Sequence, residues 1–171
     1  MSDFTPAVRL LQSNDADDYL AFLCKLDAQS SFMHYRSGER SMTVQGMRSR
    51  IRKQEKQGNC FVALAIGIDD KPIGYFSVNG GNSLSTKHSA TVAVGVLSEY
   101  RDRGVASRLF DFAVNEAVRR CVNRFECTVV EKNVAAVTFY YRQNFRLAGY
   151  MRNRFYDGVE HFDELVLEYQ F

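Results

Sequence analysis

Three short apolar runs, rich in β-branched and aromatic residues, follow one another at residues 61–68, 73–78 and 90–97. Only the turn sequence Asp-Asp-Lys-Pro at 69–72 separates the first two. Runs of this length between turn residues are typical of β-strands, and so short a spacer is typical of a hairpin. The chain must therefore build a sheet from its middle part, and the flanking segments have to cover that sheet.

The flanking segments alternate between helical and strand patterns. From Val105 onward apolar residues recur at helical spacing, Asn133 is placed to cap a further helix, and Asn144 is placed to stop it. The predicted order is strand, two helices, three strands, helix, strand, helix and two strands, an α/β fold with a mixed sheet. Outside the three runs, elements are expected at residues 8–11, after 13–15, at 44–57, from 105, and at 125–130, 134–143, 146–155 and 164–169.

The composition supports one folded domain. Of the 171 residues 46% are hydrophobic, enough to build a core without disulfides or metal ions. The chain has two prolines and no stretch rich in glycine and serine or in proline. We therefore expect residues 1–171 to form a single domain.

Charge and hydropathy argue against two classes of partner. Twenty-two Lys and Arg against twenty Asp and Glu leave a net charge of +2, whereas sequence-independent binding to nucleic acid needs a larger excess. The basic residues of segment 44–57 fit a solvated helix face better than a nucleic-acid surface. No apolar run approaches the roughly 20 residues that span a bilayer, and the N-terminus has no signal-like pattern. We expect a cytoplasmic protein that binds neither nucleic acid nor membrane.

The cysteines and histidines show no metal-ligand spacing. Cys24, Cys60, Cys121 and Cys127 form no Cys-x-x-Cys pair, and no histidine stands at zinc-ligand distance beside them. Reduced and mostly buried thiols are expected, and no metal site.

The segment at residues 96–107 carries the strongest functional signal, because a strand ends, a short turn follows, and a helix begins at once. The first amides of a helix have no internal partner and its dipole is positive at that end, so a phosphate group can bind there. Gly104 and Ala106 leave room for the ligand, and Arg101 and Arg103 add positive charge. Neither the G-x-x-x-x-G-K-[ST] motif nor the G-x-G-x-x-G motif is present.

Two segments resemble the GNAT superfamily of acetyl-CoA-dependent N-acetyltransferases. Arg101-Asp102-Arg103-Gly104-Val105-Ala106 is similar to its phosphate-binding motif at every fixed position. Asn133-Val134-Ala135-Ala136-Val137-Thr138-Phe139-Tyr140, followed by Asn144-Phe145, is similar to its second segment, with Asn144 in place of the usual Gly. The resemblance covers about residues 59–149 and implies a GNAT-like, mostly antiparallel sheet with a splayed parallel strand pair at its centre, flanked by helices.

The resemblance also implies where acetyl-CoA binds. Its pantetheine arm would lie in the gap between the strands ending at Leu97 and Val130. Asn133 and Phe139 would line the pantetheine or thiol side. The backbone of Val94, Val96 and Leu97 would pair with the arm, and the amides of Arg101, Asp102, Arg103, Gly104, Val105, Ala106 and Ser107 would hold the pyrophosphate.

The resemblance indicates a general acid but does not identify the general base. Tyr140 stands at the position of the family's general acid, and a phenol can protonate the departing CoA thiolate. Many members place a Glu as general base on the strand before the predicted phosphate-binding turn, here called the phosphate turn (residues 101–107). Residues 88–95, which precede this turn, contain no Glu. Glu131 and His88 are the candidates, acting directly or through water.

The resemblance implies direct acetyl transfer to a primary amine of a small molecule within a ternary complex. A protein or peptide N-acetyltransferase and a non-catalytic acyl-CoA binding module are the alternatives. The acceptor pocket would be built by residues 30–46 and 151–161, which contain both acidic and basic groups and so leave the acceptor open. Many members form homodimers, which makes a second copy of the chain a further candidate partner.

Overall fold

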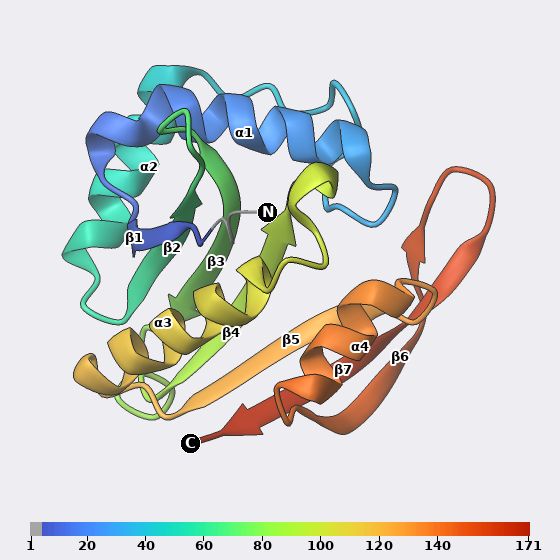
Figure 1. Cartoon of the computed structure of the whole chain (residues 1–171). Helices are drawn as coiled ribbons and strands as arrows, with labels where there is room; N and C mark the ends of the chain where they lie inside the picture. Colours follow the sequence, from blue (N-terminus) through green and yellow to red (C-terminus); the bar gives the residue numbers. More distant parts are fainter. Residues whose placement is uncertain (1–4) are drawn as a thin grey trace.

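The computed structural model describes residues 5–171, which form a seven-stranded sheet with helices on both faces (Figure 1). The strand order is β1-β2-β3-β4-β5-β7-β6, and every neighbouring pair is antiparallel except β4 and β5. The strands are β1 (Ala7–Leu10), β2 (Cys60–Ile66), β3 (Pro72–Gly80), β4 (Ser89–Val96), β5 (Arg124–Val130), β6 (Arg146–Tyr156) and β7 (His161–Gln170). The helices are α1 (Ala16–Gln29), α2 (Val44–Lys56), α3 (Val105–Arg119) and α4 (Val134–Arg142).

The predicted order of elements is confirmed, and so is the predicted mixed sheet with one parallel pair. Two 3₁₀ turns, η1 (Ser13–Asp15) and η2 (Ser98–Tyr100), were not predicted, because a single turn has no apolar period to detect. The hairpin between β2 and β3 closes with a hydrogen bond from the Gly67 amide to the Lys71 carbonyl.

The helix α3 packs on one face of the sheet through a stripe of apolar residues. Val105, Leu109, Ala113 and Ala117 recur every four residues, and each is 2% exposed or less. They join a core cluster with sheet residues such as Phe76. The four-residue spacing places the stripe on one side of the helix, which explains why this face becomes the core.

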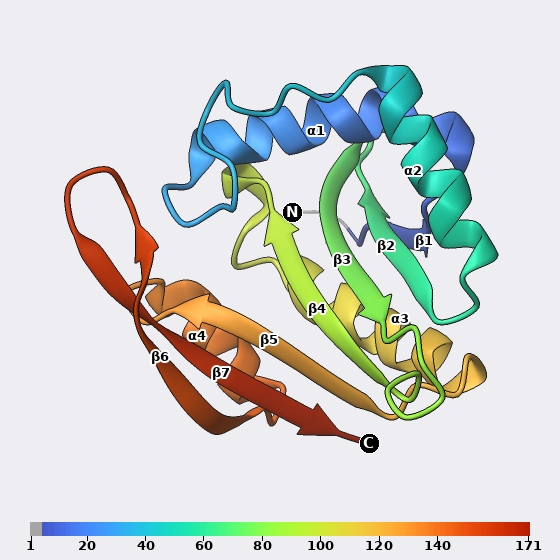
Figure 2. The same cartoon turned by 180° about the vertical axis from the view of Figure 1, so that it is seen from behind.

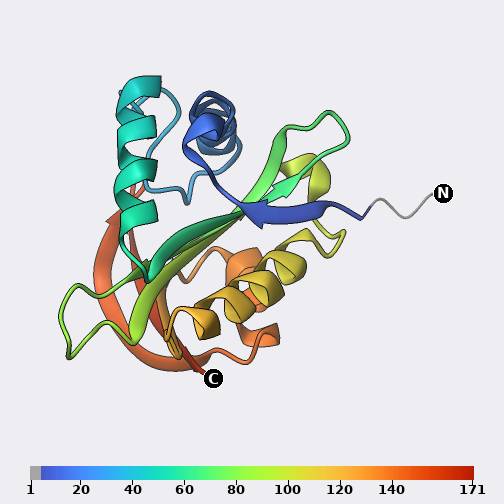
Figure 3. The same ribbon diagram turned by 90° about the vertical axis from the view of Figure 1, so that its left-hand side faces the viewer.

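The helices α1 and α2 cover the opposite face over β2 and β3 (Figures 2 and 3). Leu26 of α1 and Ile51 of α2 are 1% and 2% exposed and pack in a second cluster with Leu64 of β2 and Tyr75 of β3. The strand β2 is therefore buried on both faces, and so is most of β3.

The parallel strands β4 and β5 pair over only three residues each. Ser89–Thr91 lie opposite Arg124–Glu126, while the strands continue to Val96 and Val130 (Figure 1). Over this continuation β4 pairs with β3 and β5 pairs with β7. The two facing edges separate, and their backbone groups have no ladder partner there.

The thiols differ in exposure from the prediction. Cys60 and Cys127 are buried, but Cys24 and Cys121 are exposed, so the expectation of mostly buried thiols is wrong for half of them. Cys121 lies in the exposed turn after α3 and has a φ of 58°. Cys24 lies on the exposed face of α1. None of the helices within residues 5–171 has the length and apolar character needed to cross a bilayer.

Candidate active site

The peptide groups of Val94 and Val96 point into the gap between β4 and β5. The amide of Leu97 donates to the Ile73 carbonyl of β3 at 3.0 Å, which fixes the direction of the peptide groups along β4. Because alternate residues of an antiparallel pair face opposite edges, Val96 and Val94 turn their N–H and C=O groups toward β5. The gap is therefore lined by backbone groups without a strand partner, of which the Val96 carbonyl accepts from the Arg101 side chain and the Val94 amide faces Tyr140.

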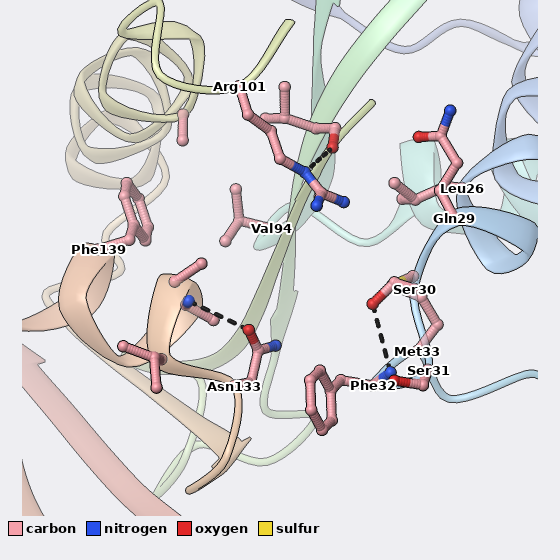
Figure 4. A pocket seen from close by; sticks show the side chains of 16 residues that line it. Leu26, Gln29, Ser30, Ser31, Phe32, Met33, Val94, Arg101, Asn133 and Phe139 are labelled. Atoms are coloured by element: carbon pink, nitrogen blue, oxygen red, sulfur yellow. Dashed lines mark hydrogen bonds between the residues drawn. The ribbon is translucent and has the colours of Figure 1, made fainter. Parts of the chain in front are cut away.

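A cleft of about 410 Å³ opens along this gap. In Figure 4, Val94, Arg101, Asn133 and Phe139 lie on one side of it, and residues from the end of α1 and the segment after it lie on the other. The lining residues are Leu26, Gln29, Ser30, Ser31, Phe32, Met33, Val94, Gly95, Val96, Arg101, Ala106, Asn133, Val134, Ala135, Ala136 and Phe139.

The turn before α3 presents unoccupied backbone amides. Gly104 is the N-cap residue and has a φ of 73°, a left-handed conformation that Gly adopts without strain. A Cβ at Gly104 would have nothing within 4 Å, so the approach to the turn is open. No hydrogen bond within residues 5–171 occupies the amides of residues 102–107. The Arg101 amide, which was also expected to hold the pyrophosphate, instead donates to the Ser98 carbonyl at 3.3 Å, so the prediction for this amide is corrected. This helix start is therefore suited to a phosphate group.

Two arginines stand at the turn in different positions. The side chain of Arg101 turns back toward the end of β4 and donates from Nε to the Val96 carbonyl at 3.1 Å, as Figure 4 shows. The guanidinium of Arg103 lies over the Tyr100 ring, 5.9 Å from its centre. Both positive charges are close enough to the turn to add to its attraction for an anion.

The end of α1 holds the segment that leads into this turn. Gln29 accepts a hydrogen bond from the Ser98 amide at 2.8 Å and donates to Glu99 at 3.1 Å. Lys25 contacts the other Glu99 oxygen at 2.6 Å. The hydrogen bond from Lys25, followed by those from the Glu99 backbone and from Gln29, lowers the pKa of Glu99 to about 2. A cleft residue on α1 thus fixes the start of the phosphate turn.

Tyr140 lies at the point where β4 and β5 part. Its side chain is 4% exposed, and its ring contacts Phe139 and Phe145. The Cys127 thiol of β5 and the Val94 amide of β4 face its hydroxyl. Burial raises the pKa of Tyr140 well above its ordinary value, and the Cys127 thiol adds to the rise. The phenol therefore stays protonated and can act as a proton donor.

The sequence model of the acetyltransferase (GNAT) family matches residues 23–145. This match covers both the phosphate turn and the segment that contains Tyr140.

The chain belongs to the acetyltransferase (GNAT) family.

Members of the GNAT family use acetyl-CoA as co-substrate. The family assignment agrees with the resemblance predicted from residues 101–106 and 133–145.

Solved structures of GNAT proteins share the fold at low sequence identity. The GNAT acetyltransferase from Streptococcus pneumoniae is 21% identical, with a TM-score of 0.92 over 98% of this chain and 100% of that one. The ribosomal-protein-alanine N-acetyltransferase from Brucella melitensis is 18% identical, with a TM-score of 0.83 over 96% and 99%. The putative acetyltransferase yncA from Salmonella typhimurium, solved with its cofactor acetyl-CoA, is 13% identical, with a TM-score of 0.84 over 98% and 94%. No curated protein matches the sequence significantly.

The cleft brings together most residues predicted for the GNAT co-substrate. Val94, Val96, Arg101, Ala106, Asn133 and Phe139 line it. Asp102, Arg103 and Gly104 form the turn beside it, and Val105 and Ser107 begin α3. Ser107 also accepts a hydrogen bond at 3.1 Å from Gln143, the residue that follows α4, which ties the start of α3 to the second family segment.

Leu97 differs from the other predicted backbone partners. Its amide donates to Ile73 and its carbonyl accepts from Tyr100, so neither group is left for a ligand. The side chain is 4% exposed and packs in the α1–α2 core cluster. The prediction for Leu97 is therefore corrected, because strand alternation turns its peptide groups toward β3 and the 3₁₀ turn takes its carbonyl.

The two candidates for the general base lie apart. His88 is exposed just before β4, six residues before Val94 and therefore about 20 Å away along the strand. This position excludes His88 as the base. Glu131 is exposed on the turn between β5 and α4, two residues before Asn133, and its amide donates to the Asp163 carbonyl. Its role as general base stays a prediction.

The sequence alone did not identify the contribution of α1. Leu26 and Gln29 line the cleft, but on the sequence they belong to an ordinary amphipathic helix. No local motif marks them, because their role depends on how α1 lies against the end of β4.

The hairpin segment 151–161, which was expected to help build the acceptor pocket, is absent from the lining of the cleft. It contacts the other expected segment, because Arg36 between α1 and α2 donates to the Tyr156 carbonyl at 3.2 Å.

Proposed function

We propose that this protein transfers the acetyl group of acetyl-CoA to a primary amine of a small molecule, by direct attack within a ternary complex. The observation that carries the proposal is the arrangement of three features at one cleft. The unoccupied amides of residues 102–107 are at one end, and the backbone of Val94 and Val96, which has no strand partner on this edge, follows. Tyr140 is buried behind Val94.

The co-substrate would use these features in order. The pyrophosphate binds the amides of the turn and the charge of Arg101. The pantetheine amides pair with the backbone of Val94 and Val96 as an added strand would. Asn133 and Phe139 line the thiol side. The Asn133 side chain also caps α4, because it accepts a hydrogen bond from the Ala136 amide at 3.3 Å.

The reaction then needs one base and one acid. A base removes a proton from the acceptor ammonium, and the neutral amine attacks the thioester carbonyl carbon to form a C–N bond. The tetrahedral intermediate loses the second nitrogen proton to water and collapses with cleavage of the C–S bond. Tyr140 gives its proton to the sulfur and regains one from solvent. Glu131 acting through water is the proposed base, since the cleft lining within residues 5–171 includes no carboxylate or histidine.

A covalent acetyl-cysteine intermediate is disfavoured by the state of Cys127. Burial raises the pKa of this thiol to about 12, so it is protonated at neutral pH. A thiol rather than a thiolate is a poor nucleophile. Direct transfer from CoA to the amine therefore fits this site better than a two-step route.

A non-catalytic acyl-CoA binding module is the alternative that one observation favours, namely the lack of a base among the lining residues. Thiol release from acetyl-CoA across a panel of amino acids, polyamines, aminoglycosides and peptides separates the two functions. We expect amine-dependent thiol release and, by calorimetry, CoA binding. Binding of CoA with no thiol release for any acceptor would favour the binding module, and failure to bind CoA would refute both.

A further inference from the structure

A second pocket, of about 300 Å³, lies on the α1–α2 face of the sheet. It shares Met33 with the cleft and extends over β3 under the two helices. Its lining residues are Tyr19, Leu23, Met33, His34, Tyr35, Arg40, Met47, Arg50, Gln54, Val62, Tyr75, Ser77 and Asn79.

Two buried tyrosines offer unused hydrogen-bond donors to this second pocket. Tyr19 and Tyr75 are 6% and 8% exposed, and their rings meet edge to face. No hydrogen bond within residues 5–171 involves either hydroxyl, yet both residues line the pocket. Burial raises the pKa of Tyr75 to about 12 and that of Tyr19 further, so both hydroxyls keep their protons. No buried side-chain oxygen or nitrogen among the described residues lacks a partner, so these two hydroxyls are open to the pocket, where a ligand acceptor can bond to them.

The charge at the second pocket is positive. Arg40 is already neutralised, because it makes two hydrogen bonds to the buried Asp27 at 2.7 and 3.0 Å. Arg50 forms no ion pair or hydrogen bond with any residue in the range 5–171, and its charge acts on both Tyr19 and Tyr75. The described lining contains no carboxylate. A cationic group would find no counter-charge here, whereas an anion would meet a guanidinium and two hydroxyls.

The second pocket is one strand away from the cleft. Tyr75 pairs with Gly95, which lines the cleft, so the two backbones are about 5 Å apart. A Cβ at Gly95 would lie 2.7 Å from the Tyr75 ring, which shows how closely the ring packs against β4. A small molecule anchored at Tyr75 can therefore reach the edge of the cleft past Met33.

We infer that the second pocket binds the acceptor by a carboxylate, so that the acceptor is a small amino acid rather than a polyamine. This inference rests on the proposed acetyltransferase function. The planar guanidinium of Arg50 suits bidentate contact with a carboxylate, and the hydroxyls of Tyr19 and Tyr75 donate to the same oxygens. A volume of about 300 Å³ is at the lower end for small-molecule sites, which favours a single amino acid over a longer chain.

Binding without turnover tests the inference directly. The common amino acids, their carboxamides and the matching decarboxylated amines are titrated by calorimetry into the protein saturated with CoA. We expect at least one amino acid to bind, and its carboxamide and amine to bind at least tenfold more weakly. Equal or tighter binding of the carboxamide or amine, or no binding by any amino acid, would overturn the inference.

Variants separate recognition from folding. Arg50→Gln should weaken binding of the amino acid at least tenfold and leave that of its carboxamide nearly unchanged. Arg52→Gln, an equal charge change at an exposed site on the same helix, should have no effect. Tyr75→Phe keeps the buried ring and should weaken binding several-fold. If Arg50→Gln and Arg52→Gln behave alike, Arg50 does not recognise the carboxylate and the inference fails.

The same panel is scored for thiol release, so that the two proposals can fail separately. An amino acid that binds through Arg50 but releases no thiol supports the carboxylate site and counts against the acetyltransferase function. Thiol release with polyamines but not with amino acids supports the acetyltransferase function and refutes the carboxylate site.

Discussion

The Nε of Arg101 donates to the carbonyl of Val96 at 3.1 Å, so a phosphate-turn side chain covers a strand carbonyl that faces the gap. This contact joins the charged turn to the backbone that we propose for the pantetheine arm.

Replacement of Arg101 by Gln should weaken CoA binding about tenfold, because one charge-assisted contact to phosphate is lost. Calorimetry at two salt concentrations measures this, and the salt dependence should fall in the variant. Arg119→Gln, at the exposed C-terminal end of α3, makes the same charge change and should leave binding intact. Equal affinities for the two variants would remove Arg101 from the site.

Gly104 allows a test in which only charge differs. Asp and Asn have nearly the same shape, both tolerate the φ of 73° better than most residues, and the space around a Cβ is open. Gly104→Asp should abolish CoA binding by repelling the pyrophosphate, whereas Gly104→Asn should weaken it less. If Gly104→Asp binds CoA as well as the wild type, phosphate does not bind at this turn.

Tyr140→Phe should lower turnover by roughly 100-fold and leave acetyl-CoA affinity nearly intact, because only the proton donor is removed. Tyr141→Phe, at a 45% exposed position on the same helix, serves as the control. The pKa of Tyr140 is raised well above its ordinary value, so the donor stays protonated and wild-type turnover should show no loss from this group up to pH 10. Unchanged turnover in Tyr140→Phe, with proton transfer limiting the rate, would exclude Tyr140 as the acid.

The buried ion pair of Arg40 and Asp27 should matter for stability. Their side chains are 9% and 1% exposed, so Arg40→Met leaves Asp27 unpaired in the core. We expect a loss of about 3 kcal/mol in the free energy of unfolding. Lys71→Met breaks the exposed pair with Asp18 and should cost less than about 1 kcal/mol. Urea denaturation measures both, and losses of equal size would contradict the difference in burial.

Asp15 should make stability depend on pH in the acid range. Its oxygens accept from Arg9 at 2.7 and 2.8 Å, and this hydrogen bonding lowers its pKa. A lowered pKa stabilises the fold above the unfolded value, about 3.9, and the contribution is lost as pH falls through the lower folded value. The melting temperature of Asp15→Asn should therefore approach that of the wild type as pH falls below about 4. A constant difference across this range would show that the carboxylate charge is not responsible. Asp17→Asn, exposed on α1, is the control.

Much of the fold follows from local patterns. Three of these patterns involve only residues close along the chain, so they can be predicted without tertiary information. They are the period of two in the strands, the four-residue stripe of α3, and the caps at Gly104 and Asn133. The phosphate turn is also local, because it needs only a strand end, a Gly and a helix start within a few residues. For the same reason the GNAT segments were recognisable in the sequence.

The rest depended on contacts between distant segments. The resemblance includes Leu97 among the backbone partners of the pantetheine arm, but only the pairing of β4 with β3 decides which edge each peptide group faces. His88 is a candidate on the sequence, but the length of β4 places it about 20 Å from Val94. The positions of Gln29 and Arg50 followed from the packing of α1 and α2 on the sheet.

The sequence by itself determined the order of elements and the anion-binding turn, because both arise from interactions between residues close along the chain. Only the tertiary structure decided where the parallel strands part, which side chains face the cleft, and that Arg50 meets Tyr19 and Tyr75 at one pocket. These depend on the relative placement of segments up to about a hundred residues apart, which local propensity and periodicity do not specify.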